Sequence, residues 1–263
     1  MRNAQSKYAE VIMATTQRQD QIMNILLDEG YVTVERLSRR VHISESSVRR
    51  DLAALEKNGL VHRSYGGAEP TNTDAVNMSF ESRMLLNQQK KKQIAQVALT
   101  ILKSGNVILC NGGSTVQFLV QLLPSIKGLM VITNGIEALY FLSRNNVKAI
   151  STGGVVSSDN KNSLVGGKTV AFWKDIKADF AFLSTQTVDS DGNIYTSYEN
   201  EIDTTLSMLD AAQTRILLCD SSKVAKTSTF KICSLRDVDI VICDKDLSAK
   251  YKKKFPNVTF LHP

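Results

Sequence analysis

The sequence is poor in cysteine, proline and tryptophan, and it contains no long apolar segment. No apolar run approaches the ~20 residues that a helix needs to cross a bilayer, so we expect no membrane partner. Residues 1–20 are polar and lack the apolar stretch of a secretory signal peptide. These absences predict a globular protein of the cytoplasm.

The few cysteines follow no spacing that is typical of a zinc site. Cys110 and Cys219 each follow an apolar run, as expected for thiols buried in a core, and the others are Cys233 and Cys243. We therefore expect four reduced thiols, no metal and no cofactor. A structural disulfide or a metal site is the alternative.

Positive charge is concentrated in one short segment. The net charge of +6 is compatible with a polyanionic partner but does not identify one. Residues 1–72 carry ten Lys and Arg against nine Asp and Glu, so this region is nearly neutral as a whole. Between residues 36 and 66, seven bases face only three acids. These bases are Arg36, Arg39, Arg40, Arg49, Arg50, Lys57 and Arg63.

Residues 18–67 follow the pattern of an α+β winged helix-turn-helix. Apolar residues at helical spacing predict a helix over 18–29, ended by Gly30, and two more that begin after Thr33 and Ser44. His42-Ile43 is the expected turn between them. Residues 60–63 favour a short strand and Gly66-Gly67 a tight turn, so we expect a two-stranded wing.

The third helix carries hydroxyls and arginines near its N-terminus, where a helix in the major groove meets the base edges. Serine hydroxyls can donate to phosphates, and arginine can bind guanine or phosphate. Similar helices occur in domains that bind no DNA, which is the alternative. We expect Asp51 to be structural, and Tyr65 either to pack in the wing or to contact DNA. The candidate DNA-binding residues are Arg36, Ser44, Ser46, Ser47, Arg49, Arg50, His62, Arg63 and Tyr65.

From Lys90 onward, buried-strand patterns alternate with helical ones, which predicts an α/β domain with a mostly parallel sheet. Polar, glycine-rich loops follow several strands, and ligands of open α/β sheets bind beyond the carboxyl ends of strands. Backbone N–H groups and hydroxyls there can bind phosphate. The candidate effector-binding residues are Asn111, Gly112, Gly113, Ser114, Thr115, Thr133, Asn134, Gly153, Gly154 and Lys223.

Polar and charge patterns suggest five segments. They are an N-terminal extension (1–17), a DNA-binding domain (18–72), a linker (73–89), a sensor domain (90–247) and a C-terminal tail (248–263). A connecting helix over 79–89 is expected, and Lys250–Lys254 is expected to form a solvated helix face.

The N-terminal pattern resembles the helix-turn-helix of the DeoR family of bacterial transcription regulators, above all at Ser47-Val48-Arg49-Arg50-Asp51-Leu52 and Gly66-Gly67-Ala68. Residues 79–247 resemble the family's sensor domain, at points that include Lys91, Gly113-Ser114-Thr115, Glu201 and Asp220-Ser221-Ser222-Lys223. The resemblance implies a fold similar to ribose-5-phosphate isomerase, and a phosphorylated sugar that changes DNA affinity.

Two departures from the family pattern bear on the ligand. Asn111 stands where the family usually has an aspartate, and Ser184–Val188 replaces a segment that tends to contain glycines. An asparagine cannot act as a carboxylate base, which argues against isomerase chemistry.

We expect a homodimeric or homotetrameric transcription regulator, most often a repressor, of a carbohydrate or related metabolic operon. It binds double-stranded operator DNA and is not an enzyme. One alternative is a regulator that has lost small-molecule sensing and answers to a protein partner. Another is a sugar-phosphate isomerase-like enzyme with Asp220 or Glu201 as the base.

Overall fold

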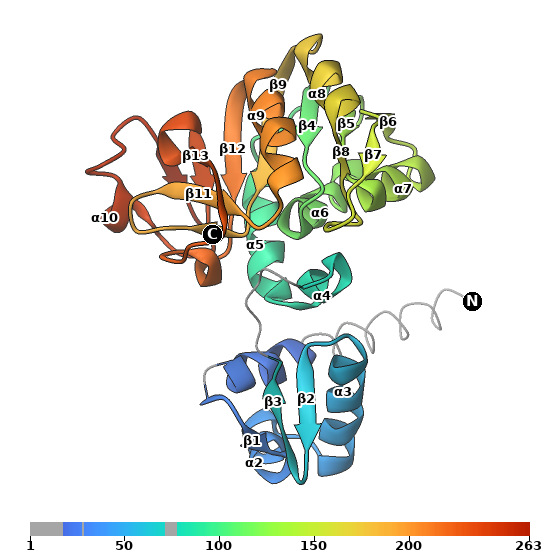
Figure 1. Cartoon of the computed structure of the whole chain (residues 1–263), viewed down its shortest axis with the longest axis vertical. Helices are drawn as coiled ribbons and strands as arrows, with labels where there is room; N and C mark the ends of the chain where they lie inside the picture. Colours follow the sequence, from blue (N-terminus) through green and yellow to red (C-terminus); the bar gives the residue numbers. More distant parts are fainter. Residues whose placement is uncertain (1–17, 28, 72–77) are drawn as a thin grey trace. The chain divides into compact units, whose positions relative to one another are not determined.

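The computed structural model describes residues 18–27, 29–71 and 78–263 (Figure 1). The chain divides into two compact units, residues 1–89 and residues 90–263. The predicted extension at 1–17 and part of the predicted linker, 72–77, lie outside the described residues.

The first unit contains the three predicted helices. Residues 18–27 are helical, and α2 (Val34–Val41) and α3 (Glu45–Lys57) follow. The hydroxyl of Thr33 accepts the N–H of Arg36 at the start of α2, which confirms the predicted cap. His42 ends α2 in the left-handed conformation, with φ of 56°, and so makes the turn toward α3.

The wing has one strand more than the sequence predicts. β1 (Val32–Thr33) pairs with β3 (Gly67–Pro70), which pairs with β2 (Val61–Ser64), in the order β1-β3-β2. Gly67 makes this packing possible, because a Cβ there would lie 2.6 Å from the Tyr31 hydroxyl. The two-residue β1 is too short to leave a periodic signal.

Part of the predicted linker belongs to the first unit. Residues 78–86 include α4 (Phe80–Leu85), and Met78, Leu85 and Leu86 pack on the core formed by the three helices and the wing. Asn87, with φ of 53°, interrupts the predicted connecting helix, and α5 (Gln88–Leu99) begins just after it.

The second unit is built on a seven-stranded sheet in the order β15-β14-β12-β9-β4-β5-β6, and all its neighbouring strands are parallel. This confirms the predicted α/β class. The strands are β4 (Val107–Cys110), β5 (Met130–Thr133), β6 (Lys148–Ser151), β9 (Ala178–Ser184), β12 (Ala212–Leu218), β14 (Ile240–Ile242) and β15 (Thr259–Leu261).

Helices alternate with these strands, and α8 and α9 pack against each other (Figure 1). The helices are α6 (Ser114–Val120), α7 (Ile136–Arg144), α8 (Gly167–Lys174), α9 (Ile202–Asp210) and α10 (Ser248–Tyr251). Single 3-10 turns lie at Leu123–Ser125, Glu199–Glu201, Ser221–Lys223 and Leu235–Asp237.

Two small antiparallel sheets complete the unit, and the sequence pattern did not reveal them. One has the order β10-β11-β13, with β10 (Thr187–Val188), β11 (Asn193–Thr196) and β13 (Phe230–Ser234). The other pairs β7 (Val155–Val156) with β8 (Leu164–Val165).

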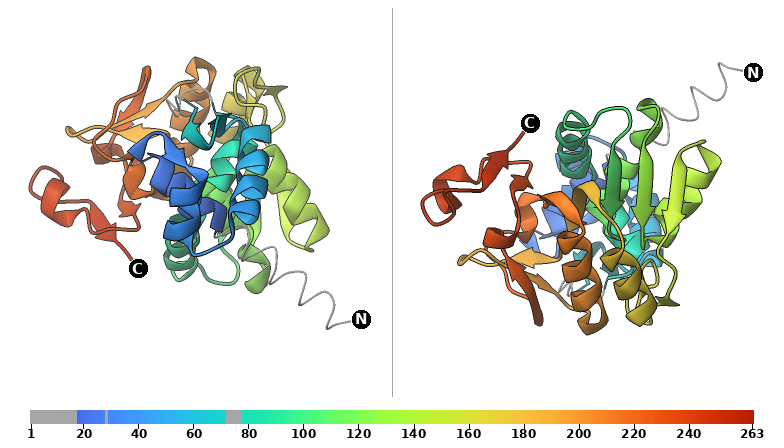
Figure 2. Two further views of the ribbon diagram at one scale, coloured as in Figure 1. Left: turned by 90° about the horizontal axis from the view of Figure 1, so that it is seen from below. Right: turned by 90° about the horizontal axis from the view of Figure 1, so that it is seen from above.

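The predicted C-terminal tail is wrong as a separate segment. β15 joins the main sheet beside β14, and Tyr251, Phe255 and Val258 are buried in its core. The three lysines between Tyr251 and Phe255 are exposed, as are Pro256 and Asn257. In both views of Figure 2 this red segment and the light-green α7 lie at opposite ends of the sheet.

All four cysteines are buried and none forms a disulfide, as predicted. Within residues 18–27, 29–71 and 78–263, no cluster of His, Cys, Asp or Glu could hold a metal ion. No helix of the described residues is long and apolar enough to cross a membrane.

Candidate DNA-binding surface and ligand-binding edge

The N-terminus of α3 carries a cluster of hydroxyls. Ser44 caps the helix by accepting the N–H of Ser47 at 3.3 Å. Its hydroxyl also lies 2.9 Å from that of Ser46 and 3.0 Å from that of Ser47. The three predicted serines therefore converge at one helix end, where free N–H groups favour a phosphate.

The two arginines of α3 differ in their partners. Arg49 makes an ion pair with Glu45, one turn earlier, at 2.6 Å, whereas Arg50 contacts the hydroxyl of Ser47 at 3.3 Å. Both guanidinium groups come from exposed residues. Within the described residues, Arg50 and Lys57 are the two cations of the 36–66 segment that lack a carboxylate partner.

More of the bases in the 36–66 segment are paired with carboxylates than the composition of that segment suggests. Glu29 binds both Arg36 and Arg40, and Glu35 binds Arg39. Glu29 and Glu35 lie just outside the segment in the sequence, so counting charges within it missed them. Each of these three arginines is therefore held by a carboxylate of the same unit.

Asp51 is structural, as the sequence predicts. Its carboxylate accepts two bonds from the guanidinium of Arg18, Nε at 2.5 Å and Nη2 at 2.8 Å. Asp51 is buried on the inner face of α3, so the pair fixes α3 against the first helix. The hydrogen bonds that Arg18 donates to Asp51 raise the pKa of Arg18, and they outweigh burial, which lowers it.

The wing places its predicted residues on an exposed surface. Tyr65 is fully exposed at the tip, and its carbonyl accepts the Tyr31 hydroxyl at 3.0 Å. This exposure favours contact with DNA over packing within the wing. Arg63 is held back toward α3, because its Nε donates to Glu56 at 2.7 Å, and His62 lies exposed beside it on β2.

In the second unit, the strand order reverses between β4 and β9. From β4 the chain proceeds to β5 and β6 on one side, and later to β9 and β12 on the other. Such a reversal opens a crevice beyond the carboxyl ends of the two strands, where ligands of open α/β sheets bind. Most predicted effector residues follow β4 and β5, at this edge.

Asn111 joins the two strands at the reversal. Its Nδ2 donates to the Ser184 carbonyl at 2.8 Å, and its Oδ1 accepts the Ser184 N–H at 3.0 Å. An aspartate could make only the second bond, because a carboxylate has no donor. Asn111 therefore bonds to the backbone of the segment in which the second departure begins, and its amide holds β4 against β9.

The glycines after β4 allow close approach of neighbouring segments. A Cβ on Gly113 would lie 1.7 Å from the Ser184 hydroxyl, and one on Gly112 would lie 2.6 Å from the Ser163 hydroxyl. Ser114 and Thr115 follow in the first turn of α6 and are buried. Hydroxyls and backbone N–H groups thus gather at the start of α6.

Two predicted residues lie near this point with unsatisfied polar atoms. Asn134 Oδ1 and Thr115 Oγ1 are buried and have no hydrogen-bond partner in the described part of the chain. An unmade hydrogen bond of this kind costs about 1–3 kcal/mol, so a polar ligand would stabilise the edge. Thr133 is different, since its hydroxyl already donates to the Cys110 carbonyl at 2.7 Å.

Gly153 and Gly154 follow β6, where the chain passes close to α8. The Gly153 carbonyl accepts the Thr169 hydroxyl at 2.7 Å, and a Cβ on Gly154 would lie 2.2 Å from that hydroxyl. Both glycines have positive φ, of 65° and 116°. This strand end packs closely on α8, which accounts for the two glycines.

A group of lysines surrounds Asp220 at the end of β12. Lys223 donates to the Thr185 carbonyl at 2.6 Å, Lys90 donates to Ser221 at 3.3 Å, and Lys91 is only 2% exposed. Burial opposes ionisation of Asp220, but the charges of Lys223 and Lys91 outweigh it and hold its pKa below the usual range. These three ammonium groups act on one carboxylate, and a second one, that of Asp244, accepts the N–H and the hydroxyl of Ser221 beside them.

Sequence reasoning named Lys223 but not Lys90 as a site residue, and it noted Lys91 only as a point of resemblance. Both lysines lie in the first turns of α5, some 130 residues from Asp220 in the chain. No local pattern links such distant segments, so only the resemblance could have pointed to Lys91.

The segment between β7 and β8 contributes a second missed group. Asn162 donates to the Gly112 carbonyl at 2.9 Å, and its Oδ1 accepts the Glu137 N–H at 2.8 Å. Asn160 donates to Glu201 at 2.6 Å. The two bonds of Asn162 hold residues 160–163 next to the segments that follow β4 and β5.

Both halves of the chain match known families. Residues 18–74 match the DeoR-like helix-turn-helix domain, and residues 86–245 match the DeoR C terminal sensor domain.

Curated relatives match along nearly the whole chain. The L-fucose operon activator of Haemophilus influenzae is 30% identical and covers 90% of this chain and 94% of its own length. The regulator GolR of Listeria innocua is 31% identical, with 91% and 94% covered. The transcriptional repressor CsqR of Escherichia coli is 27% identical, with 90% of each covered. All three are named as regulators of transcription or of an operon.

Solved structures match over part of the chain. Ribose 5-phosphate isomerase A from Methanocaldococcus jannaschii is 17% identical, with a TM-score of 0.39 over 52% of this chain and 55% of that one. A translation initiation factor eIF-2B from Pyrococcus horikoshii is 11% identical, with a TM-score of 0.44 over 87% and 85%. Similarity this low supports no conclusion about activity.

Proposed function

This chain belongs to the DeoR family of transcriptional regulators, and from that premise we propose that it is a repressor controlled by a phosphorylated sugar. The sugar phosphate would bind at the carboxyl edge of the seven-stranded sheet and change the affinity for operator DNA. The regulated operon would serve carbohydrate or related metabolism, and the protein would act in the cytoplasm as a homodimer or homotetramer.

The main support for this proposal is the set of polar groups at the carboxyl edge of the sheet, where the parallel strands end. Lys90, Lys91 and Lys223 gather around Asp220, and buried polar atoms of Thr115 and Asn134 lack partners in the described residues. Cations favour a phosphate, and unpaired hydroxyl and amide groups favour a polyol. A sugar phosphate supplies both.

The DNA-binding half of the proposal rests on α3 and the wing. The serine cluster at the start of α3 suits a phosphate, and the exposed Arg49 and Arg50 suit base edges or phosphates in the major groove. The exposed Tyr65 extends the same surface. Two half-sites on one duplex would require at least a dimer.

For regulation, the sugar phosphate must bind one arrangement of the oligomer more tightly than the other. Couplings of this kind are typically 5- to 150-fold in affinity. A repressor requires that the DNA-free arrangement binds the sugar phosphate better.

The test combines DNA selection with a ligand panel. The full-length protein selects its preferred sequences from a pool of random duplexes, and retardation of the selected duplex is then measured with ribose 5-phosphate and other phosphorylated pentoses and hexoses. We expect one sugar phosphate to weaken binding by about tenfold or more. Lys223→Gln should remove this response and leave binding without ligand unchanged.

The outcomes separate the two halves of the proposal. If no duplex is retarded at low salt, the DNA-binding half is wrong. If DNA binds but no sugar phosphate raises the melting temperature or changes retardation, the sensing half is wrong.

One observation favours a second candidate, a regulator that answers to a protein partner. The Asn111–Ser184 bonds and the Ser184 hydroxyl beside Gly113 occupy space at the reversal of strand order. If the edge is closed to small molecules, the failed ligand panel would be the expected result. The isomerase alternative is not favoured, because Asn111 is engaged with backbone groups and the curated relatives are named as regulators.

A further inference from the structure

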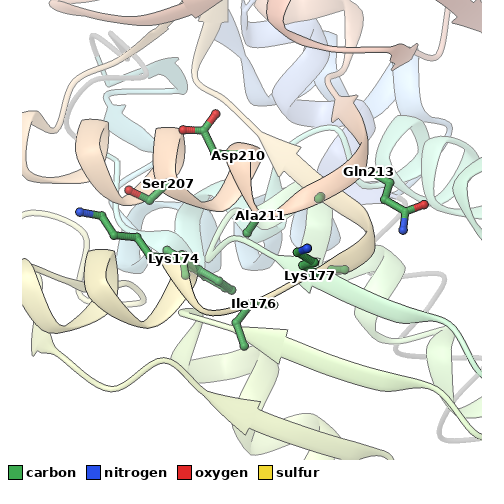
Figure 3. A pocket seen from close by; sticks show the side chains of 10 residues that line it. Lys174, Ile176, Lys177, Ser207, Asp210, Ala211 and Gln213 are labelled. Carbon is green, nitrogen blue, oxygen red and sulfur yellow. The ribbon is translucent and has the colours of Figure 1, made fainter.

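A second cleft lies at the opposite, amino-terminal edge of the same sheet. It has a volume of about 470 Å³ and lies where α8 and α9 end and β9 and β12 begin (Figure 3). The seven residues of β9 separate the two edges by about 20 Å, at ~3.3 Å per residue. The cleft is therefore distinct from the site proposed for the sugar phosphate.

The polar side chains of this cleft are uncommitted. Lys174, Lys177, Ser207 and Asp210 line it, and none has a hydrogen bond or ion pair with any described residue. A cleft whose polar groups all remain available is suited to a polar ligand.

Trp173 adds an independent observation. It lines the cleft and is completely buried, yet its Nε1 has no hydrogen-bond partner among the described residues. A buried indole N–H usually has an acceptor. The indole therefore lies directly beneath the cleft as an apolar, fully buried part of its lining.

The lining determines the class of ligand. The lining contains two lysines, Lys174 and Lys177, and one carboxylate, that of Asp210, so the cleft favours one negative charge on the ligand. Asp210 and the last carbonyls of α8 and α9 accept hydrogen bonds, which hydroxyl groups can donate. Ile176, Ala178 and Ala211 provide an apolar surface for a short carbon chain. The volume is within the range of small-molecule sites.

We propose that the cleft between the ends of α8 and α9 binds a small hydroxycarboxylate, such as a sugar acid. The carboxylate contacts the lysines, hydroxyls donate to Asp210, and the carbon chain lies against the apolar part of the lining. This site does not depend on the effector proposed for the carboxyl edge.

The protein carries its own reporter, because Trp173 is the single tryptophan of the chain. The experiment measures its fluorescence in the full-length protein during titration with D-gluconate. Sorbitol, an uncharged polyol of the same carbon number, is the matched control compound. Glucose 6-phosphate tests whether a phosphate can replace the carboxylate.

We expect gluconate to change the fluorescence saturably and sorbitol to leave it unchanged. The double variant Lys174→Gln/Lys177→Gln, at two exposed positions, should weaken gluconate binding by about tenfold. Lys223→Gln, at the other edge of the sheet, should leave gluconate binding unchanged. Melting temperatures of both variants verify that they fold.

Three results would overturn the proposal. The first is an absence of any saturable response to gluconate, or an equal response to sorbitol. The second is a response that Lys223→Gln removes and the double variant keeps, since Trp173 would then report on the carboxyl edge. The third is a fluorescence change on dilution without ligand, which would identify the cleft as a contact between copies of the chain.

Discussion

The DNA-binding surface and the carboxyl edge of the sheet hold their functional groups in opposite ways. On α3 both arginines are exposed; Arg49 pairs with an exposed carboxylate, that of Glu45, at 61% and 45% side-chain exposure, and Arg50 contacts the hydroxyl of Ser47. At the carboxyl edge, Asp220 and Lys91 are almost completely buried, and Asn111 bonds to backbone groups.

This difference has energetic consequences. Exposed ion pairs contribute about 0–1 kcal/mol, so the surface of α3 can exchange its own carboxylates for DNA at little cost. Breaking a buried pair costs about 3–5 kcal/mol, so substitutions at the carboxyl edge should affect folding as well as binding. The comparison predicts that variants of α3 lose function without losing stability, whereas variants of the buried charges at the edge, Asp220 and Lys91, lose stability as well.

The largest effect is expected for Arg50→Ala. Arg50 has no carboxylate partner in the described residues, so its guanidinium is the most available one on α3. Operator affinity should fall by about 100-fold, as expected for losing a good arginine contact, with no change in melting temperature. Retardation of the selected duplex measures the affinity. Lys253→Ala, at an exposed position of the second unit, is the control and should bind normally.

Next comes Asp220→Asn, which leaves Lys91 and Lys223 without their carboxylate. We expect a loss of about 3 kcal/mol in the free energy of unfolding at pH 7. Because the pKa of Asp220 is lowered in the folded state, its contribution is present above about pH 4 and is lost as the pH falls further. The difference between variant and parent should therefore shrink below pH 4 in urea titrations.

Asp246→Asn provides the control for that measurement, because Asp246 is exposed and bonds only to groups of Ser248. A loss at Asp246 as large as that at Asp220 would show that burial does not distinguish the carboxyl edge.

A smaller effect is expected for Asn111→Asp. The carboxylate keeps the bond from the Ser184 N–H but faces the Ser184 carbonyl without a donor. The free energy of unfolding should fall by about 1–3 kcal/mol. Asn145→Asp, which removes one exposed bond to Phe141, should cost less. Equal losses for both variants would contradict the role of Asn111 in joining β4 to β9.

The smallest and most specific effect concerns Glu45. Glu45→Gln and Glu35→Gln each remove one exposed i to i+4 partner of an arginine and change the net charge equally. If Glu45 orients Arg49 toward a base, only Glu45→Gln should relax the preference at one base pair, by roughly five-fold. Selection from random duplexes by both variants measures this preference. If both variants select the same sequences, the Arg49–Glu45 ion pair has no role in reading a base.

Much of the molecule could be predicted from the sequence where the signal is local. Ser44, Thr33 and Gly30 mark helix ends through their own hydrogen bonds or backbone angles, and these predictions are confirmed. The parallel sheet follows from alternating buried runs. The prediction of a separate tail at 248–263 was wrong because lysines dominate the composition of this segment. Tyr251 and Phe255 are too few to reveal that it is buried.

The sequence by itself determined the two kinds of unit, the position of α3, and the chemical types of side chain after β4 and β5. These depend on periodicity and capping, which act over a few residues. Only the tertiary structure decided that Asn111 bonds to Ser184, that Lys91 lies near Asp220, and that Trp173 lines a second cleft. Each of these depends on segments distant in the chain, which the order of parallel strands brings together.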